Sequence, residues 1–373
     1  MTRPIPFLSV IVPAYNGGRV LPLTLPALAA SDLPRDCWEL IVIDDASTDD
    51  TAAYAARFAD SVVRLPGKPH GPAYARNRGF ESARGDVVVF IDADVCVHPD
   101  TLRRFAWLFA ERSDLGAVFG SYDTRPPAPG MVSQYRNLMH HYVHHQNAGP
   151  AETFWAGCGA VRSSVFAECG KFDEWHYSRP QIEDIELGHR IRAHGHPILL
   201  RPEIQGTHLK KWSLRNVLTT DLHDRGVPWM RLIVEQGDTA NTGVLNVRLR
   251  EKILTALMWL ALLMVLAAAI LRETWFLAGA VLLLVPVIIL NMPFYRFFAR
   301  ERGTWFALRV LPMHLVYYFL NGLAALWGWA LHHIIGEPKP PPDVQAFAEV
   351  GVQVWPPIPS KTPRGPWQAE GGK

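Results

Sequence analysis

The first part of the chain alternates short apolar runs with segments of helical periodicity. Apolar runs of strand length occupy 8–13, 39–43, 62–65 and 86–91. Segments with helical spacing lie between them at 20–30, 48–58 and 72–83. Nearly continuous apolar strands separated by helices are typical of a parallel sheet covered on both faces. We therefore predict an α/β fold with a Rossmann-like, mostly parallel sheet and helices on both faces.

Polar residues gather where these strands end. Asn16 follows the first strand, Asp44-Asp45 the second, and Asp92 and Asp94 the fourth. Ligands of open parallel sheets bind outside the carboxyl ends of the strands. Two carboxylates beside a buried strand require a cation, and their oxygens suit Mg²⁺ or Mn²⁺ bound with phosphate oxygens. An Asp-x-Asp sequence also occurs in ordinary turns, so the spacing alone leaves both interpretations open.

The last third of the chain is apolar over long distances. Segments 253–271, 274–292 and 310–335 contain no Asp, Glu, Lys or Arg. A helix of 19 residues spans about 28 Å, close to the hydrocarbon thickness of about 30 Å. We predict three transmembrane helices in a membrane region 253–335. Buried core helices are the alternative.

Basic residues flank the predicted spans on one side. They are Arg248, Arg250, Lys252, Arg296, Arg300, Arg302 and Arg309. By the positive-inside rule, the domain before the first span faces the cytoplasm of an inner membrane. We predict a catalytic domain at 1–235 and a basic juxtamembrane segment at 236–252. The Pro-rich tail 336–373 is predicted to be flexible; three spans place it on the far side, and a fourth crossing or a re-entrant third segment would reverse that.

Composition narrows the functional class. A net charge of +2 argues against a nucleic-acid-binding protein. The four cysteines have no zinc or CxxC spacing, which favours small core residues in a reducing compartment. No GxGxxG follows the first strand, which argues against a dinucleotide-binding dehydrogenase. The N-terminal apolar run lacks a cleavage site, so we expect no cleaved signal peptide.

Six sequence segments together indicate a family. They are SVIVPAYN, ELIVIDDASTDDT, GPAYARNRG, VVVFIDADV, GCGAVRSSVFAECGKFDE and IEDIELGHRI. In this order and spacing, they resemble the family 2 glycosyltransferases, which have a GT-A nucleotide-sugar-binding fold. The resemblance covers 8–235. It implies an inverting, hexosyltransferase-type enzyme with a divalent metal, Mn²⁺ or Mg²⁺, bound to the nucleotide diphosphate through a DxD motif.

The resemblance also implies a donor site. Its expected donor-binding residues are Pro13, Ala14, Tyr15, Asp44, Asp45, Gly71, Arg76, Asn77 and Asp92. One carboxylate of the Asp44-Asp45 pair would accept a hydrogen bond from a uracil-type base. The expected metal ligands are Asp92, Asp94 and His208. Structural alternatives stay open: a turn and helix cap at Asp44-Asp45, an exposed helix around Arg76, and a surface histidine at His208.

The same resemblance implies the catalytic and acceptor residues. The catalytic carboxylates would be Glu183 and Asp184, with Asp184 as the base that removes the proton of an acceptor hydroxyl. Ordinary acids at a helix N-terminus are the alternative. The acceptor-side residues would be Trp155, Gly157, Cys158, Gly159, Arg225 and Trp229. Arg225 and Trp229 match the QxxRW motif of processive synthases only loosely, which argues against processive synthesis.

One cluster falls outside these motifs. His140, His141, His144 and His145 form two i,i+4 pairs in MHHYVHHQN. Such spacing occurs in zinc sites, although the Glu of an HExxH sequence is missing. A polar helix beside the acceptor cleft is the interpretation we favour over a structural metal.

These observations predict a glycosyltransferase that moves a sugar from a UDP- or GDP-sugar to a hydroxyl of a lipid-linked acceptor, in synthesis of a cell-envelope glycan or glycolipid. A polyprenyl-phosphate glycosyltransferase is the alternative within enzymes. A non-catalytic nucleotide-binding membrane scaffold is the alternative of another class, and the presence of every acidic motif argues against it.

Overall fold

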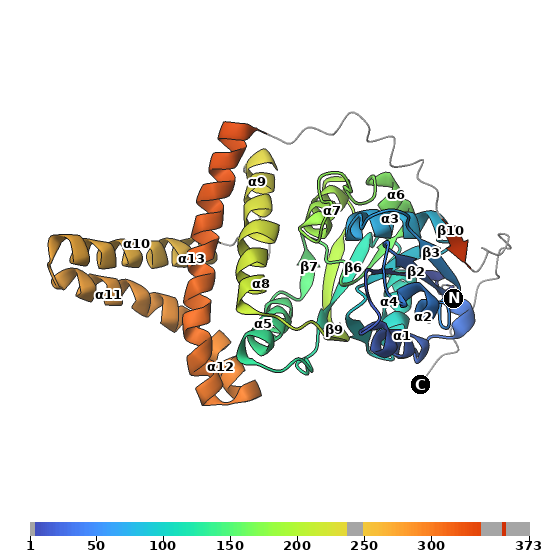
Figure 1. The fold of residues 1–373 in the computed structure, drawn as a ribbon, viewed down its shortest axis with the longest axis horizontal. Coiled ribbons are helices and arrows are strands. Elements are labelled where there is room, and N and C mark those ends of the chain that lie inside the picture. The colour runs from blue at the N-terminus through green and yellow to red at the C-terminus, as the bar shows by residue number, and fades with distance from the viewer. Residues whose placement is uncertain (1–3, 237–248, 337–352, 356–373) are drawn as a thin grey trace. The chain divides into compact units, whose positions relative to one another are not determined.

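The computed structural model describes residues 4–236, 249–336 and 353–355 (Figure 1). The chain forms two compact units. The sheet unit comprises Met1–Pro127, Val143–Lys210 and Pro338–Lys373, and the helical unit comprises Ala128–Tyr142 and Lys211–Glu337. The tail predicted to be flexible lies almost entirely outside the described residues. The predicted domain boundary at 235 stays a prediction.

Four parallel strands form the first half of the sheet. In spatial order they are β3 (Ser61–Arg64), β2 (Trp38–Asp44), β1 (Leu8–Ala14) and β4 (Val87–Ile91). Every residue of β2 and β4 is buried. Burial on both faces explains why the sequence shows continuous apolar runs here rather than alternation.

The second half of the sheet is mixed. Its strands are β5 (Val95–Val97), β6 (Ala117–Tyr122), β7 (Gly149–Ala151), β8 (Cys158–Arg162) and β9 (Ile198–His208). β8 is antiparallel to β4 and β6, and β9 is parallel to β6 but antiparallel to β5 and β7. A short strand, β10 (Gln353–Trp355), adds to the first half at the other edge, antiparallel to β3. The predicted α/β fold is confirmed, with a sheet that is parallel in its first half and mixed beyond β4.

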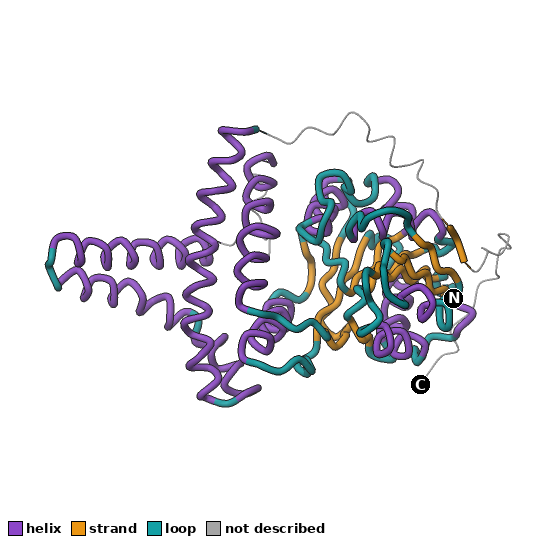
Figure 2. Tube along the Cα trace, viewed as in Figure 1, coloured by secondary structure: helices purple, strands orange, loops and turns teal. Residues whose placement is uncertain are grey.

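Helices lie on both faces of the sheet (Figures 1 and 2). They are α1 (Leu21–Ala29), α2 (Thr51–Ala55), α3 (Pro72–Ser82), α4 (Thr101–Glu111), α6 (Ser163–Glu168) and α7 (Glu183–Ala193), with a 3-10 turn at Arg35–Cys37. Alternate strand residues such as Leu8 and Val10 pack with α1, α2 and α4 in one core cluster. Ile11 and Phe90 face the other way, toward α3 and α6.

The four cysteines are free thiols. Cys37, Cys158 and Cys169 are buried, and Cys96 is half-buried. Burial raises the pKa of the Cys158 thiol to about 12 and that of Cys37 to about 11. The prediction that cysteines serve as small core residues is confirmed for these three buried positions.

The helical unit contains the apolar C-terminal part of the chain. Its elements are the first part of α5 (Met131–Gln146), α8 (Leu214–Thr219), a π-helix (Thr220–Gly226), α9 (Val227–Gln236), α10 (Leu249–Leu271), α11 (Trp275–Leu290), α12 (Met292–Arg302) and α13 (Thr304–Ile335). Arg136 on α5 pairs with Asp221 in the π-helix through two contacts, at 2.6 Å and 3.1 Å. Both side chains are buried.

Two described helices, α10 and α13, are long and apolar enough to cross a membrane. They contain the predicted spans 253–271 and 310–335. The predicted span 274–292 corresponds to α11, which is followed by α12 after a bend of 61° and forms with it a broken span or a re-entrant loop. By length and composition, the described residues therefore contain two candidate spans, or three if the bent pair is one span.

A side-chain network holds this bend. Asn291 donates to the carbonyl of Val287 at 2.8 Å and to the Tyr318 hydroxyl at 3.0 Å. Tyr318 in turn donates to Glu251 at 2.9 Å. One polar residue at the break thus links α11 to α13 and α10.

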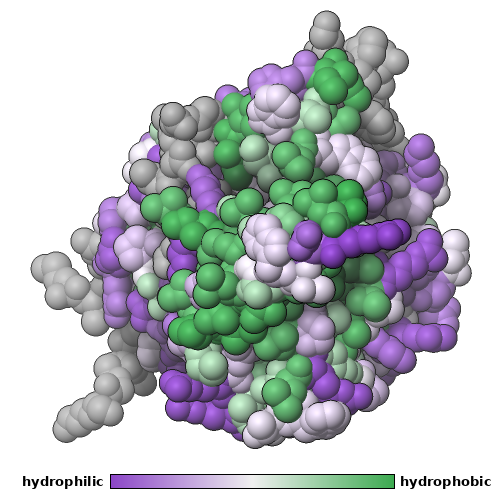
Figure 3. Space-filling model, turned by 90° about the vertical axis from the view of Figure 1, so that its left-hand side faces the viewer, coloured by the Kyte–Doolittle hydropathy of each residue, from purple (hydrophilic) through white to green (hydrophobic). Residues whose placement is uncertain are grey.

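α10 and α11 expose large apolar side chains. They include Leu260, Leu263, Leu266, Ile270, Trp275, Val281, Leu282, Val285 and Ile289. Figure 3 looks onto the end where α10 and α11 are connected and shows hydrophobic side chains gathered in this view. Exposed apolar surface of this extent marks contact with a membrane or a protein. The alternative of buried core helices is wrong for α10 and α11.

Candidate active site

The loop before α3 is held by Asp45, the second of two buried carboxylates at the end of β2. Asp45 accepts the backbone N–H groups of His70, at 2.9 Å, and of Gly71, at 2.8 Å. Gly71 has φ +96°, and a Cβ there would lie 2.4 Å from the Ser178 carbonyl oxygen. Only glycine fits this position. Asp44 accepts the N–H of Ser47, so a turn-forming role exists beside any role in base binding.

The end of β1 carries the residues predicted to line the nucleoside. Pro13 and Ala14 lie within β1, and Ala14 is buried. Tyr15 follows, with 51% of its surface exposed. Its exposed ring is therefore accessible to a ligand that binds at the carboxyl ends of the parallel strands.

A buried guanidinium joins the two acidic motifs. Arg76 on α3 donates to Asp92 Oδ1 and to Glu183 Oε1, both at 2.8 Å. Burial disfavours the charged guanidinium, yet Asp92 and Glu183 raise the pKa of Arg76 above its ordinary value. Arg76 is only 4% exposed, so the alternative of an exposed helix face is wrong for this residue. The end of β4 and the start of α7 therefore share one charged cluster.

The predicted catalytic pair begins α7. Glu183 is buried, and its second oxygen accepts the N–H of Gln181 at 3.0 Å. Asp184 accepts the N–H of Ala156 at 3.0 Å and that of Ile185 at 2.8 Å. These backbone donors fix the Asp184 carboxylate against 155–157, the segment predicted to face the acceptor.

Asp94 and His208 form the candidate metal site. Asp94 Oδ2 lies 3.5 Å from His208 Nε2. β5 and β9 bring them together through the pairing of Val95 with His208, and His208 stacks on Tyr122 with ring centroids 4.1 Å apart. His208 is buried, so the alternative of a surface histidine is wrong. Burial opposes ionisation of Asp94, but the hydrogen bond and charge of His208 hold its pKa below the ordinary value.

These two donors fit part of a Mn²⁺ or Mg²⁺ coordination sphere. Across the described ranges, no three His, Cys, Asp or Glu side chains gather closely enough to hold a metal by themselves. Mg²⁺ typically uses one or two carboxylates and completes its sphere with water and phosphate oxygens. Asp92 lies close by in sequence, but its Oδ1 is bonded to Arg76. The donor set therefore fits a cation shared with a diphosphate rather than a closed protein site.

Close backbone packing surrounds the acceptor-side segment. A Cβ on Gly157 would lie 2.6 Å from the Trp155 ring and 3.1 Å from Asp92 Oδ2, and one on Gly159 would lie 2.3 Å from the Trp155 carbonyl oxygen. Glycine is thus required for Trp155 to sit beside Asp92. Cys158 is fully buried in the core cluster, so its thiol does not face an acceptor.

Arg225 and Trp229 belong to the helical unit. Arg225 Nη1 lies 3.4 Å from His140 Nε2 in that unit. Their role on the acceptor side stays a prediction.

The histidine cluster does not converge on one point. His141 stacks on Phe297, with centroids 5.7 Å apart. His144 contacts Trp155 edge-on at 4.9 Å, and His145 lies 3.4 Å from Gln205. Among the described side chains no metal-binding group includes them. The packing agrees with ordinary helix contacts rather than a structural metal.

Sequence reasoning missed several residues of the site. His70 lies 3.2 Å from Asp45 and stacks on Tyr74. Tyr122 supports His208, and the Phe172 ring lies 5.4 Å from the Arg76 guanidinium. An aromatic residue at the end of a strand was the one available signal, for Tyr122 after β6. His70 and Phe172 lie in loops, where periodicity gives no information.

Comparison with known proteins finds a family match over part of the chain. Residues 9–170 match the model of Glycosyl transferase family 2. Validoxylamine A glucosyltransferase from Streptomyces hygroscopicus subsp. jinggangensis is 27% identical over 236 residues, covering 55% of this chain and 56% of that protein. Undecaprenyl-phosphate 4-deoxy-4-formamido-L-arabinose transferase from Pseudomonas syringae pv. syringae is 34% identical over 118 residues, covering 30% and 35%. The chain spans about half the length of the first of these relatives.

A solved structure supports the fold. The mannosyltransferase PcManGT from Pyrobaculum calidifontis, in complex with GDP-Man and Mn²⁺, has a TM-score of 0.52 and 20% identity, covering 86% of this chain and 87% of that chain. Together with the family match over the sheet, this likeness confirms the predicted GT-A-type architecture.

Proposed function

We propose that this chain, whose residues 9–170 belong to glycosyl transferase family 2, transfers a sugar from a nucleotide-sugar donor to a hydroxyl of a lipid-linked acceptor. The observation that carries the proposal is the Arg76 bridge, with contacts of 2.8 Å to Asp92 and to Glu183. It joins the carboxylate expected at the donor ribose to the pair expected to activate the acceptor. A donor-side and an acceptor-side acid in one cluster is what a sugar transfer requires.

The chemistry follows from the residues. Asp184 takes the proton of the acceptor hydroxyl, whose oxygen forms a bond to the anomeric carbon as the bond from that carbon to the diphosphate oxygen breaks. The nucleoside diphosphate leaves with the bonding electrons, and attack from the opposite face inverts the anomeric centre. A divalent cation bound by Asp94 and His208 would stabilise the charge on the departing diphosphate.

The donor and the cation have support from the comparison. PcManGT is in complex with GDP-Man and Mn²⁺ in its solved structure. For this chain we propose a UDP- or GDP-sugar with Mn²⁺ or Mg²⁺, contacted by Tyr15, Asp45 and Asp92. The backbone at Gly71 lets the chain approach the base.

The membrane assignment rests on the helical unit. α10 and α13 are long and apolar enough to span a bilayer, and α10 exposes apolar side chains. Cationic residues flank these helices on one side, which favours a catalytic domain on the cytoplasmic face of an inner membrane. An enzyme held beside the bilayer suits an acceptor that cannot leave it, such as a lipid-linked precursor of a cell-envelope glycan.

The test uses the full chain in detergent with a panel of UDP- and GDP-sugars. We expect one donor to release nucleotide and transfer sugar only with Mn²⁺ or Mg²⁺, and EDTA to abolish both. Asp94→Ala should remove activity, while Asp114→Asn, in an exposed ion pair with Arg112, serves as the matched control. Full activity of Asp94→Ala would contradict the proposed metal site. UDP binding without sugar release from any donor would instead indicate a nucleotide-binding scaffold.

A polyprenyl phosphate is the second candidate acceptor, favoured by the likeness to the undecaprenyl-phosphate transferase of Pseudomonas syringae. A phosphate is already ionised and needs no base, so Asp184→Asn would retain transfer to it. The product would be a lipid-soluble sugar phosphate that mild acid cleaves. For a hydroxyl acceptor, Asp184→Asn should lose transfer, and the product should not be cleaved by mild acid.

A further inference from the structure

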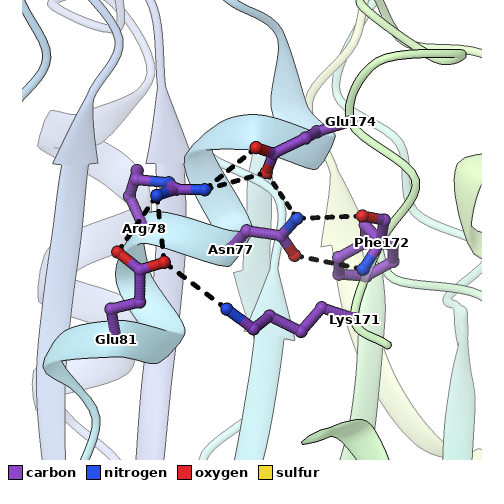
Figure 4. A network of polar contacts seen from close by, with 6 residues as sticks. All are labelled: Asn77, Arg78, Glu81, Lys171, Phe172 and Glu174. Carbon is purple, nitrogen blue, oxygen red and sulfur yellow. Dashed lines mark hydrogen bonds and ion pairs between the residues drawn. The ribbon is translucent and has the colours of Figure 1, made fainter. Parts of the chain in front are cut away.

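The two residues that follow Arg76 on α3 contact the chain segment that leads to the catalytic pair. Asn77 is buried, and its side-chain amide pairs with the backbone of Phe172: Nδ2 donates to the carbonyl at 2.9 Å and Oδ1 accepts the N–H at 3.1 Å. Asn77 Nδ2 also donates to Glu174 at 2.6 Å. Figure 4 shows this arrangement. Both amide hydrogens are therefore used within the protein.

Arg78 reinforces the same attachment. One guanidinium nitrogen donates to both oxygens of Glu174, at 2.9 Å and 3.1 Å, and the other pairs with Glu81 at 3.0 Å. Glu81 also pairs with Lys171 at 3.4 Å (Figure 4). The Arg78 and Glu174 side chains are 11% and 21% exposed, so their ion pair is largely shielded from water, whereas Glu81 is 44% exposed. Residues 171–174 are thus tied to α3 by both hydrogen bonds and charge.

The same segment meets α3 and its N-terminus at two further points. The Ser178 carbonyl packs against Gly71, where no Cβ would fit, and Glu183 accepts from Arg76 at 2.8 Å. The chain from 173 to 182 contains no described helix or strand of its own. Its course, and with it the start of α7, therefore depends on these attachments.

From this geometry we infer that Asn77 and Arg78 are positioning residues, which hold 171–183 so that Asp184 stays in register with Asp92 through Arg76. Their side-chain donors are directed at the protein, and Asn77 has no amide hydrogen left for a nucleotide-sugar. The inference rests on the proposed function, since it assigns Asp184 the role of base. It replaces the donor-binding role that the family resemblance implied for Asn77.

The inference predicts a split between binding and turnover. A misplacement of a catalytic group by about 1 Å can reduce the rate about a hundredfold. Loosening 171–183 should therefore lower kcat by about 10- to 100-fold while the Kd for UDP or GDP with Mn²⁺ changes less than about threefold. A donor ligand lost from the binding site would raise that Kd instead.

The experiment uses Asn77→Asp in the full chain. The new carboxylate faces Glu174, which accepted from Asn77 at 2.6 Å, so repulsion should detach residues 171–174. Adding Glu174→Gln to the same chain restores a donor–acceptor pair between positions 77 and 174 and should recover part of kcat, because the hydrogen bond to the Phe172 carbonyl and the ion pair of Arg78 with Glu174 stay lost. Glu174→Gln alone, a milder change at a partly exposed carboxylate, provides a test if Asn77→Asp folds poorly. Asp114→Asn is the control for loss of an exposed carboxylate.

Calorimetry with UDP or GDP and Mn²⁺ measures Kd, transfer assays measure kcat, and amide hydrogen exchange measures opening of 171–183. Lower kcat and faster exchange in Asn77→Asp, both partly recovered in the double variant, support the inference. Unchanged kcat and exchange, or a Kd that rises in step with the loss of activity, overturns it. If the wild-type chain transfers no sugar, the proposed function fails, and the exchange measurement still decides whether Asn77 holds this segment.

Discussion

Two buried arginines, one in each unit, show how differently the same residue is used. Arg136 in the helical unit directs its guanidinium at a single carboxylate, Asp221, with contacts of 2.6 Å and 3.1 Å. Arg76 in the sheet unit divides its guanidinium between Asp92 and Glu183, at 2.8 Å each. Each arginine retains a buried Nε with no partner among the described residues.

The charge balance of the two clusters differs. One cation and one carboxylate cancel around Arg136, and the Asp221 side chain is only 7% exposed. Around Arg76 two carboxylates face one cation, and the Asp92 side chain is 33% exposed. A closed, neutral pair stabilises packing, whereas an open cluster with surplus negative charge attracts a cation from solution. The difference supports the proposal that the Arg76 cluster is the functional one.

The largest effect on activity is expected when the proposed base, Asp184, is replaced beside the Arg76 cluster. Asp184→Asn removes the base. It also leaves one acceptor oxygen in place of the two that accept the N–H groups of Ala156 and Ile185. For a hydroxyl acceptor we expect kcat to fall about 10²- to 10⁴-fold. Nucleotide affinity should persist in calorimetry. Unchanged turnover would remove Asp184 from the mechanism.

Changes to the closed pair, Arg136 and Asp221, should lower the stability of the folded chain. Arg136→Ala leaves Asp221 buried without its cation and should destabilise the folded chain by about 3–5 kcal/mol. Replacing both partners, Arg136→Met with Asp221→Leu, should cost much less, because no charge stays buried alone. Thermal unfolding of both variants in the same detergent measures the difference. Equal losses in the two variants would contradict the interpretation of a closed pair.

A smaller effect is expected when the positive charge of Arg76 is kept but the guanidinium group, which donates through two nitrogens, is replaced by an ammonium group. Arg76→Lys cannot reach Asp92 and Glu183 together with the same geometry. We expect kcat to fall about tenfold, which corresponds to about 1.4 kcal/mol. The measurement is the transfer rate at saturating donor. Wild-type kcat in this variant would show that charge alone, without the bridge, is sufficient.

The smallest effect is expected at an exposed pair. Arg64 Nε lies 3.2 Å from Asp44 Oδ2, but the Arg64 side chain is 54% exposed. Arg64→Ala should change stability by less than about 1 kcal/mol. A larger loss of stability, measured by thermal unfolding against wild type, would mean that Asp44 depends on Arg64. The Arg64–Asp44 pair would then behave like a buried pair.

The parallel half of the sheet could be predicted from the sequence. Its apolar runs at 8–13 and 39–43 correspond to the strands Leu8–Ala14 and Trp38–Asp44. Strands buried on both faces are apolar at nearly every position, so they stand out in the sequence as continuous apolar runs. The helix predicted at 48–58 is Thr51–Ala55. Asp49 accepts the Thr51 N–H, which holds the preceding turn outside the helix.

The partners within the site could not be predicted in the same way. Arg76 meets Asp92 and Glu183, which are 16 and 107 residues away along the chain. Periodicity describes neighbours one or two turns apart and contains no information on such pairs. For the same reason, the sequence left an exposed Arg76 open as an alternative, and the attachment of Asn77 to Phe172 emerged only with the fold.

The buried thiols have a practical consequence for labelling this protein. Thiolates react with maleimides and thiols do not, so cysteines whose pKa is raised by burial, such as Cys158 and Cys37, should stay unmodified at neutral pH. A single cysteine introduced at an exposed position between 173 and 182, in a chain with Cys96 replaced, would then carry one fluorophore or spin label. That label would report, in real time, how the loop before the catalytic pair moves as nucleotide arrives.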